Sequence, residues 1–136
     1  MGEKLRDRND TRESCPFCRT DEALLANSLA YARLDKFPVT PGHVLIIPLR
    51  HEPIFFSVSH EELKSIWALV VKAKQLIDRK FQPDGYNLGV NVGRTSGQTI
   101  AHTHLHLIPR YRGDAVDPSG GVRGVIPAKQ HYEQEI

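Results

Sequence analysis

Three of the seven histidines in this chain lie two residues apart, at His102, His104 and His106. In a β-strand, side chains at i, i+2 and i+4 share one face, whereas on a helix they would scatter around the axis. The spacing therefore predicts a strand through all three histidines, with Leu105 on the opposite, buried face and Pro109 at its end. The outer two histidines would be roughly 13 Å apart, so we expect them to have different roles. A histidine-rich metal patch or a plain polar face are the alternatives.

The length and charge of the chain indicate one soluble globular domain. Its 136 residues are 40% hydrophobic and 25% charged, with a formal net charge of +2. We expect a flexible, charged arm over 1–13 and a single domain over 14–136. The near balance of charge predicts no nucleic-acid partner, and the short apolar runs predict no membrane partner. The charged N-terminus is unlike a signal peptide, so we expect a cytoplasmic protein.

The remaining patterns predict an α+β fold. Residues 23–35 are typical of a hairpin, 44–48 of a strand buried on both faces, and 86–92 of an alternating strand. Ser59 begins a capping box that opens a long amphipathic helix, on which Trp67 is expected in the core or at a dimer interface. We expect an antiparallel sheet of about five strands and one long helix. The glycine- and proline-rich stretch 113–127 is expected to be a loop.

Cys15 and Cys18, the only cysteines, stand in the sequence Cys-Pro-Phe-Cys. Without a secretion signal, this spacing indicates metal ligation or redox chemistry before a structural disulfide. A zinc site needs about four ligands and only two are local. The alternative is two inert cysteines in a loop.

The run His-Thr-His-Leu-His-Leu-Ile resembles the motif of the histidine triad (HIT) superfamily. The resemblance extends from roughly Cys15 to Tyr111 and is greatest to bacterial HIT hydrolases and the fragile-histidine-triad branch. One departure is Thr103, where the family usually has an apolar residue. The resemblance implies a HIT-like fold with a short N-terminal zinc-bound segment, and a homodimer.

Zinc-bearing members of the superfamily resemble this chain at Cys15, Cys18, His51 and His102. The resemblance thus implies one structural zinc ion per chain, because a closed four-ligand site leaves no position for water or substrate. The sequence lacks an acidic cluster for magnesium, so no catalytic metal is expected.

The resemblance also implies a nucleotide site. It assigns Asp35 to the ribose hydroxyls, although a turn aspartate is the alternative, and it brings His43 to the active site. It implies phosphate contacts from Asn91 and from the loop residues Gly97, Gln98 and Thr99. Arginines 110, 112 and 123 could reach a polyphosphate, but solvated loop arginines are the preferred interpretation.

His104 is the expected nucleophile, because it alone has a histidine neighbour on each side. Its neutral imidazole would attack phosphorus and form a phosphoramidate that water opens; by resemblance, His106 contacts the phosphate and assists the leaving group. We expect a nucleotide hydrolase or transferase acting at the α-phosphate of a purine nucleotide, with dinucleoside polyphosphates the preferred substrates. The alternatives are a nucleoside phosphoramidase, a non-catalytic purine-nucleotide-binding module, and a triad that holds a catalytic zinc ion.

Overall fold

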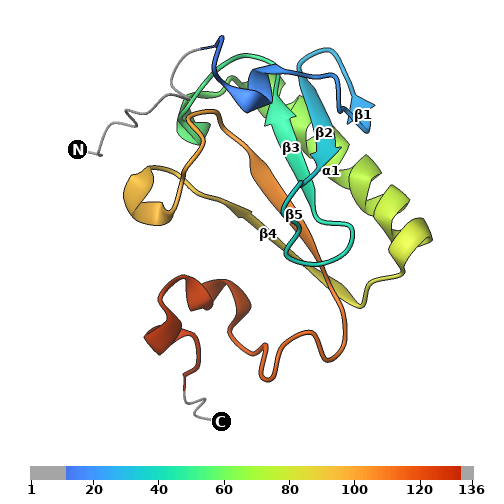
Figure 1. The fold of residues 1–136 in the computed structure, drawn as a ribbon, viewed down its shortest axis with the longest axis vertical. Helices are drawn as coiled ribbons and strands as arrows, with labels where there is room; N and C mark the ends of the chain where they lie inside the picture. Colours follow the sequence, from blue (N-terminus) through green and yellow to red (C-terminus); the bar gives the residue numbers. More distant parts are fainter. Residues whose placement is uncertain (1–11, 133–136) are drawn as a thin grey trace.

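The computed structural model describes residues 12–132, so the predicted arm over 1–13 lies almost wholly outside the described residues. Five strands form one antiparallel sheet in the order β1-β2-β3-β5-β4, and a single long helix, α1, covers one face of it (Figure 1). The predicted α+β architecture is thereby confirmed. The elements are η1 Pro16–Cys18, β1 Leu25–Ala26, β2 Ala30–Leu34, β3 Val44–Pro48, η2 Phe55–Ser57, α1 His60–Phe81, β4 Gly85–Val90, η3 Arg94–Ser96, β5 Leu105–Arg110, η4 Gly121–Val125 and η5 Pro127–Lys129.

Helix α1 begins with the predicted capping box. The Ser59 hydroxyl accepts from the backbone N–H of Glu62, and the Glu62 carboxylate accepts from the backbone N–H of Ser59. Arg50 donates to both oxygens of the same carboxylate, which keeps the pKa of Glu62 below its usual value. The helix ends at Phe81, and the next residue, Gln82, adopts the left-handed conformation that caps it.

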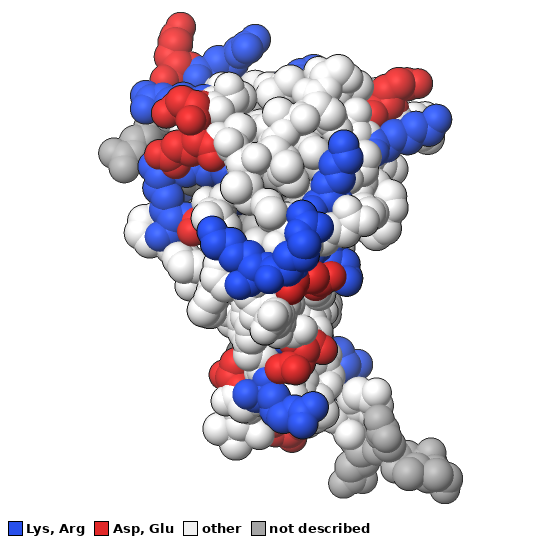
Figure 2. All heavy atoms as spheres, turned by 90° about the vertical axis from the view of Figure 1, so that its right-hand side faces the viewer, with Lys and Arg blue, Asp and Glu red and all other residues white. Residues whose placement is uncertain are grey.

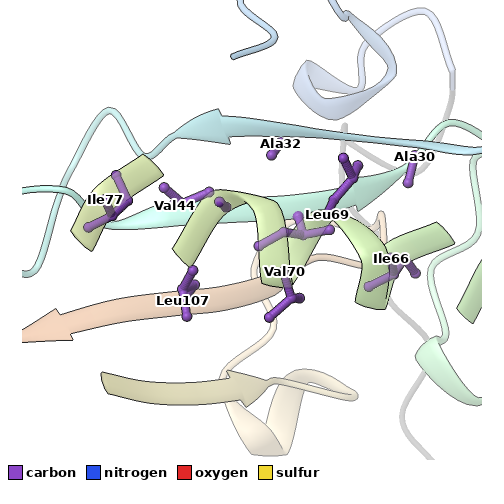
Figure 3. Close-up of a cluster of buried hydrophobic side chains, with 10 residues drawn as sticks. Ala30, Ala32, Val44, Ile66, Leu69, Val70, Ile77 and Leu107 are labelled. Atoms are coloured by element: carbon purple, nitrogen blue, oxygen red, sulfur yellow. The ribbon is translucent and has the colours of Figure 1, made fainter. Parts of the chain in front are cut away.

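The buried side of α1 packs against the sheet (Figure 3). Trp67 is not part of this core, because its side chain is 58% exposed, and Leu69 is buried beside Ile66 and Val70. The expectation that Trp67 lies in the core is therefore wrong, whereas the interface alternative stays a prediction. The cluster comprises Ala30, Ala32, Val44, Ile46, Ile66, Leu69, Val70, Ala73, Ile77 and Leu107.

The strand of the triad is shorter at its start than the alternation predicts. β5 begins at Leu105, so only His106 lies within it, and His102 and His104 precede it. The backbone N–H of Thr103 donates to the carbonyl of Glu52 in the loop after β3, at 2.7 Å. Because Thr103 bonds to this loop rather than to a strand, residues 102–104 do not join the sheet.

Pro109 does not end the strand, which continues to Arg110. Pro109 is paired with Tyr86 of β4, and its carbonyl accepts from the Thr40 hydroxyl on the other side. The β3–β5 ladder has already ended at Val44 and Leu107, so the missing N–H of the proline interrupts no hydrogen bond between strands.

Residues 113–132 form a small C-terminal lobe that lies apart from the helix and most of the sheet (Figure 1). Figure 2 shows this lobe below a narrower waist, with both signs of charge on it. The predicted loop over 113–127 contains two 3₁₀ turns, η4 and η5. Arg123 is used within the lobe: its guanidinium donates to the carbonyls of Lys129 and Gln130 and lies 4.6 Å from the ring centroid of Tyr132.

Within residues 12–132, no helix combines the length and the apolar character that crossing a membrane requires.

Gly42 lies in the loop between β2 and β3, directly before His43, and packs against the end of α1. Its φ is +88°, and a Cβ atom there would lie 3.0 Å from Cδ2 of Phe81 and 3.2 Å from Cγ2 of Ile77. Gly42→Ala is expected to lower the free energy of unfolding by roughly 2–4 kcal/mol, because backbone strain and steric overlap add. Urea denaturation measures this. Gly113→Ala is the control, since Gly113 has φ +86° but open space around it, and it should cost only about 1–2 kcal/mol. Equal losses would contradict the steric part of the explanation.

Candidate active site and metal centre

Two clusters of histidine with cysteine or carboxylate partners lie in the described part of the chain. One comprises Cys15, Cys18, His51 and His102, and the other comprises Asp35, His43 and His106. In each cluster, the candidate ligand atoms lie within 4.8 Å of one another. Their hydrogen bonds distinguish the two chemically.

The first cluster forms where β3 ends and β5 is about to begin. These strands are antiparallel neighbours, so His51, after β3, meets His102, before β5. The 3₁₀ turn η1 brings the two cysteines to them. The Sγ atom of Cys18 lies 3.2 Å from Nδ1 of His51 and 3.6 Å from Nδ1 of His102, and the Sγ atom of Cys15 lies 3.4 Å from Nδ1 of His102.

These distances fit a metal ion bound by two sulfur and two nitrogen atoms. A tetrahedral zinc ion with bonds of about 2.0–2.3 Å separates its ligand atoms by roughly 3.3–3.8 Å. Nε2 of His102 lies 2.7 Å from the carbonyl oxygen of Pro48, so it carries the proton and donates it. The lone pair of Nδ1 is thereby directed to the cysteines, as a ligand requires. The cluster could hold a metal through all four side chains.

Burial favours the metal-binding protonation state of the histidine and opposes that of the thiol. It lowers the pKa of His102 to about 4, so the ring stays neutral, and it raises the pKa of Cys15 to about 11. A buried thiol deprotonates readily only when a cation takes the place of its proton.

The second cluster is a hydrogen-bonded chain. The backbone N–H of Val39 donates to Nδ1 of His43 at 3.0 Å, which places the proton of the neutral ring on Nε2. Nε2 of His43 then donates to Nδ1 of His106 at 2.9 Å, and the carboxylate of Asp35 lies 3.5 Å from the same Nε2. To bind a metal through Nε2 while Nδ1 accepts from Val39, neutral His43 would have to lose its one ring proton. The cluster is therefore better suited to orienting His106 than to holding an ion.

His104 stands between the two clusters. Its Nδ1 lies 2.8 Å from the carbonyl oxygen of His102 and donates to it, so Nε2 carries a free lone pair. The ring is packed edge-on against Phe17 and His106, at centroid distances of 4.9 and 5.1 Å. Burial lowers the pKa of His104, which keeps the imidazole neutral.

A cavity of about 500 Å³ lies over the histidine face of the sheet, and His104 and His106 form part of its wall. Asp35, Asn91, Gly97 and Thr99, the residues assigned by resemblance to the ribose and phosphate, line the same cavity. His43 lies behind His106 and is 2% exposed. Asp35 is also a turn residue, because its Oδ1 accepts from the backbone N–H of Phe37.

Gln98 is placed differently from the phosphate donor that the resemblance implies. Its side-chain amide nitrogen donates to the carbonyls of Pro53 and Ile100, at 2.8 and 3.0 Å, and its Oε1 accepts from the backbone N–H of Gly93. The side chain is 3% exposed and shapes the loop from within. Arg110 likewise lies elsewhere, paired with Asp114 and Asn87.

Among the residues of the cavity wall that the sequence did not predict are Phe17 and Arg33. Phe17 lies between the two cysteines, so the metal cluster positions it. Arg33 precedes Asp35 by two residues, a spacing that places both on one side of an extended chain and that could have identified it.

The buried histidines predict acid sensitivity. Burial lowers the pKa of His43 and of His106. The carboxylate of Asp35 opposes this shift in both, whereas a neighbouring histidine lowers each pKa further, His104 for His43 and His43 for His106. In the unfolded chain these groups titrate near 6.5, so below that pH the unfolded state binds more protons than the folded state. Stability is then complete above about pH 6.5 and falls as the pH drops below it. Calorimetry at pH 7.5, 6.5 and 5.5 should show a falling Tm, with a shallower slope in His43→Gln; an unchanged slope in that variant would contradict the assignment.

Known proteins are similar to this chain in sequence and in fold. The model of the HIT domain matches residues 19–113. An uncharacterized HIT-like protein of Saccharolobus solfataricus is 31% identical over 125 residues, which are 88% of this chain and 90% of that protein. Bis(5'-adenosyl)-triphosphatase of Dictyostelium discoideum is 32% identical over 96 residues, which are 71% of this chain and 64% of that protein.

A solved structure shows the same fold with a metal. The zinc-bound histidine triad family protein of Mycobacterium smegmatis superimposes with a TM-score of 0.70 at 27% identity, over 79% of this chain and 82% of that one. The alternating histidines, the sheet that carries them and the matched region 19–113 agree, and the chain belongs to the HIT domain family.

Proposed function

We propose that the protein is a nucleotide hydrolase or nucleotidyl transferase that acts at the α-phosphate through a covalent nucleotidyl–His104 intermediate. The observation that carries the proposal is the hydrogen bond from Nδ1 of His104 to the carbonyl of His102. It holds the neutral ring in the tautomer whose Nε2 lone pair is free to attack. The name of the Dictyostelium relative supports a substrate of the dinucleoside polyphosphate class.

The reaction would proceed in two displacements at phosphorus. Nε2 of His104 forms a bond to the α-phosphorus while the bond to the bridging oxygen breaks and the leaving group takes that electron pair. Water, or another acceptor, then attacks the same phosphorus and the P–N bond breaks, which returns the lone pair to Nε2, while the proton of the attacking water passes to the solvent. Because Nδ1 of His106 accepts from His43, the remaining proton of His106 is on Nε2, where it can donate to a phosphate oxygen.

The hydrogen bonds from Val39 to His43 and from His43 to His106 favour a leaving group that needs no proton. With both rings neutral, His106 offers a hydrogen bond but has no spare proton to give. A nucleoside polyphosphate departs as an anion at neutral pH, whereas the amine of a phosphoramidate must be protonated. Dinucleoside polyphosphates are therefore preferred over phosphoramidates as substrates.

Incubation with diadenosine tetraphosphate and with an adenosine phosphoramidate, read by mass spectrometry, tests the proposal. Faster turnover of the tetraphosphate is expected, with AMP as one product. Preference for the phosphoramidate would contradict the argument from the leaving group. Inertness toward both, together with AMP binding, would instead identify a non-catalytic nucleotide-binding module.

The first cluster is proposed to hold one structural zinc ion per chain. Two thiolates and two imidazoles are a typical closed zinc set, and all four ligand atoms come from the protein. The metal would anchor η1 and the segment before β5, and the reacting atoms would not touch it.

A homodimer is proposed through the face formed by α1 and β4. β4 is an edge strand. Its Leu88 is 40% exposed and lines an apolar groove with Trp67 and Val71 of α1, which are 58% and 41% exposed. An apolar groove beside an open strand edge suits a second copy of the same surface. Trp67→Glu should shift the protein from dimer to monomer in analytical ultracentrifugation, whereas Lys64→Glu on the same helix should not. A monomeric parent protein at micromolar concentration would contradict the proposal.

A further inference from the structure

Arg33 belongs to a row of side chains that crosses the histidine face of the sheet. Arg33 of β2 is paired with Leu45 of β3, and Leu45 is paired with His106 of β5. Directly paired residues of antiparallel strands point to the same face. Adjacent strands are about 4.8 Å apart, so the backbone of Arg33 lies roughly 10 Å from that of His106. All three residues line the cavity, with Arg33 at the end away from the phosphate site.

The Arg33 side chain is a buried cation with incomplete pairing. It is 5% exposed, and its Nε–H is buried without a hydrogen-bond partner among the described residues. Nη2 donates to the carboxylate of Glu22, and the guanidinium carbon lies 5.9 Å from the ring centroid of Phe17. A buried charge that serves only stability is normally matched by a buried counter-charge. Glu22 is instead half-exposed and also lines the cavity.

The two charged side chains offer complementary groups to a ligand. A guanidinium presents N–H donors in a planar fork, and a carboxylate presents acceptors. The edge of a nucleobase carries donors and acceptors side by side. Phe17 and Leu45 line the same cavity and supply the apolar contacts that the faces of a base require.

We propose that Arg33, held in place by Glu22, is the residue that selects a purine over a pyrimidine base. The inference rests on the proposed nucleotide chemistry at His104. With the phosphate at His104 and the ribose at Asp35, the base extends along the row toward Arg33. A purine carries its outer edge one ring farther from the ribose than a pyrimidine does, so a purine edge reaches Arg33 and a pyrimidine edge falls short. Arg33 then adds affinity for purines alone.

Calorimetric titration of the zinc-loaded full-length protein with AMP, GMP, CMP and UMP tests this proposal. The parent protein should bind the two purine nucleotides at least about tenfold more tightly than the pyrimidines. Arg33→Leu should weaken purine binding by about tenfold and change pyrimidine binding by less than about twofold. Arg19→Gln is the control, because it removes the same charge from a residue of the cavity wall that is exposed rather than buried. It should change all four affinities by one factor and leave their ratio intact.

A second variant covers the risk that Arg33→Leu does not fold. Glu22→Gln alters a half-exposed side chain, preserves its size and removes the charge that holds the guanidinium. It should lower the purine-to-pyrimidine affinity ratio in the same direction as Arg33→Leu. An unchanged ratio in a folded Arg33→Leu protein, or in Glu22→Gln, would overturn the proposal. If all four nucleotides bind equally and turnover is normal, base selection by Arg33 is wrong but the proposed function stands. If no nucleotide binds, both proposals are wrong.

Discussion

Replacing His104 with alanine will lower the turnover of a dinucleoside polyphosphate by about 10³-fold or more. The substitution removes the nucleophile, and the rate lost with a nucleophile in covalent catalysis is typically of this size or larger. It should also abolish any nucleotidyl adduct, which intact-protein mass spectrometry of the acid-quenched parent enzyme would detect.

Binding should survive in the same variant, because Asp35, Asn91 and Thr99 still line the cavity. His60→Ala is the matched control: this histidine is exposed at the start of α1 and lies outside the cavity, so its loss should leave turnover within about twofold of the parent. If His104→Ala keeps substantial activity while His106→Ala does not, the nucleophile has been assigned to the wrong histidine.

Removing the proposed zinc ion is expected to destabilise the protein about as much as a severe core substitution. Without the ion, two thiols and two imidazoles would remain in close contact, and η1 would lose its cross-link to the segments that carry His51 and His102. Structural zinc sites contribute several kcal/mol to folding, so we expect a loss of at least about 3 kcal/mol and a fall in Tm of about 10 °C or more. Calorimetry before and after chelation measures the difference.

A structural role for the proposed zinc ion would have a distinct signature. Activity should decline only as the protein unfolds, because the closed four-ligand set offers no coordination position to substrate. Cys18→Ser should show the low Tm without any chelator, and added zinc should restore Tm in the stripped parent but not in the variant. Immediate loss of turnover at an unchanged Tm would instead indicate a catalytic ion. Metal analysis that finds two ions per chain, or none, would refute the single structural site.

Sequence patterns were sufficient for the fold because they reflect local physics. The capping box at Ser59 and the apolar run over 44–48 each satisfy a local requirement, and the structure has both. The helix face was less predictable: periodicity did not distinguish Trp67 from Leu69, because the choice depends on where the sheet lies. The early end of the alternation at β5 depends on a distant backbone contact, from Thr103 to Glu52, which no local pattern contains.

In the candidate site too, some features follow from local sequence and others depend on distant contacts. The resemblance supplied the residues, but the sequence could not reveal which nitrogen of each histidine carries the proton. Gln98 illustrates the difficulty, since an amide beside a phosphate loop can face the ligand or fasten the loop, and here it fastens the loop. The spacing of Arg33 and Asp35 indicates that they share a side, but the distance of Arg33 from His106 depends on strand register, and the position of Phe17 depends on the turn between the cysteines.

The two main-chain oxygens that fix the histidine rings have a consequence for mutational scanning. The carbonyls of Pro48 and His102 determine which nitrogen of His102 and His104 is free, and every substitution of those side chains leaves the carbonyl in place. A complete library of single amino-acid changes would therefore not test the two carbonyl groups themselves, although they determine which ring nitrogen can react or bind a metal. Replacement of either peptide bond by an ester, which weakens the carbonyl as an acceptor, would measure the contribution of these hydrogen bonds directly.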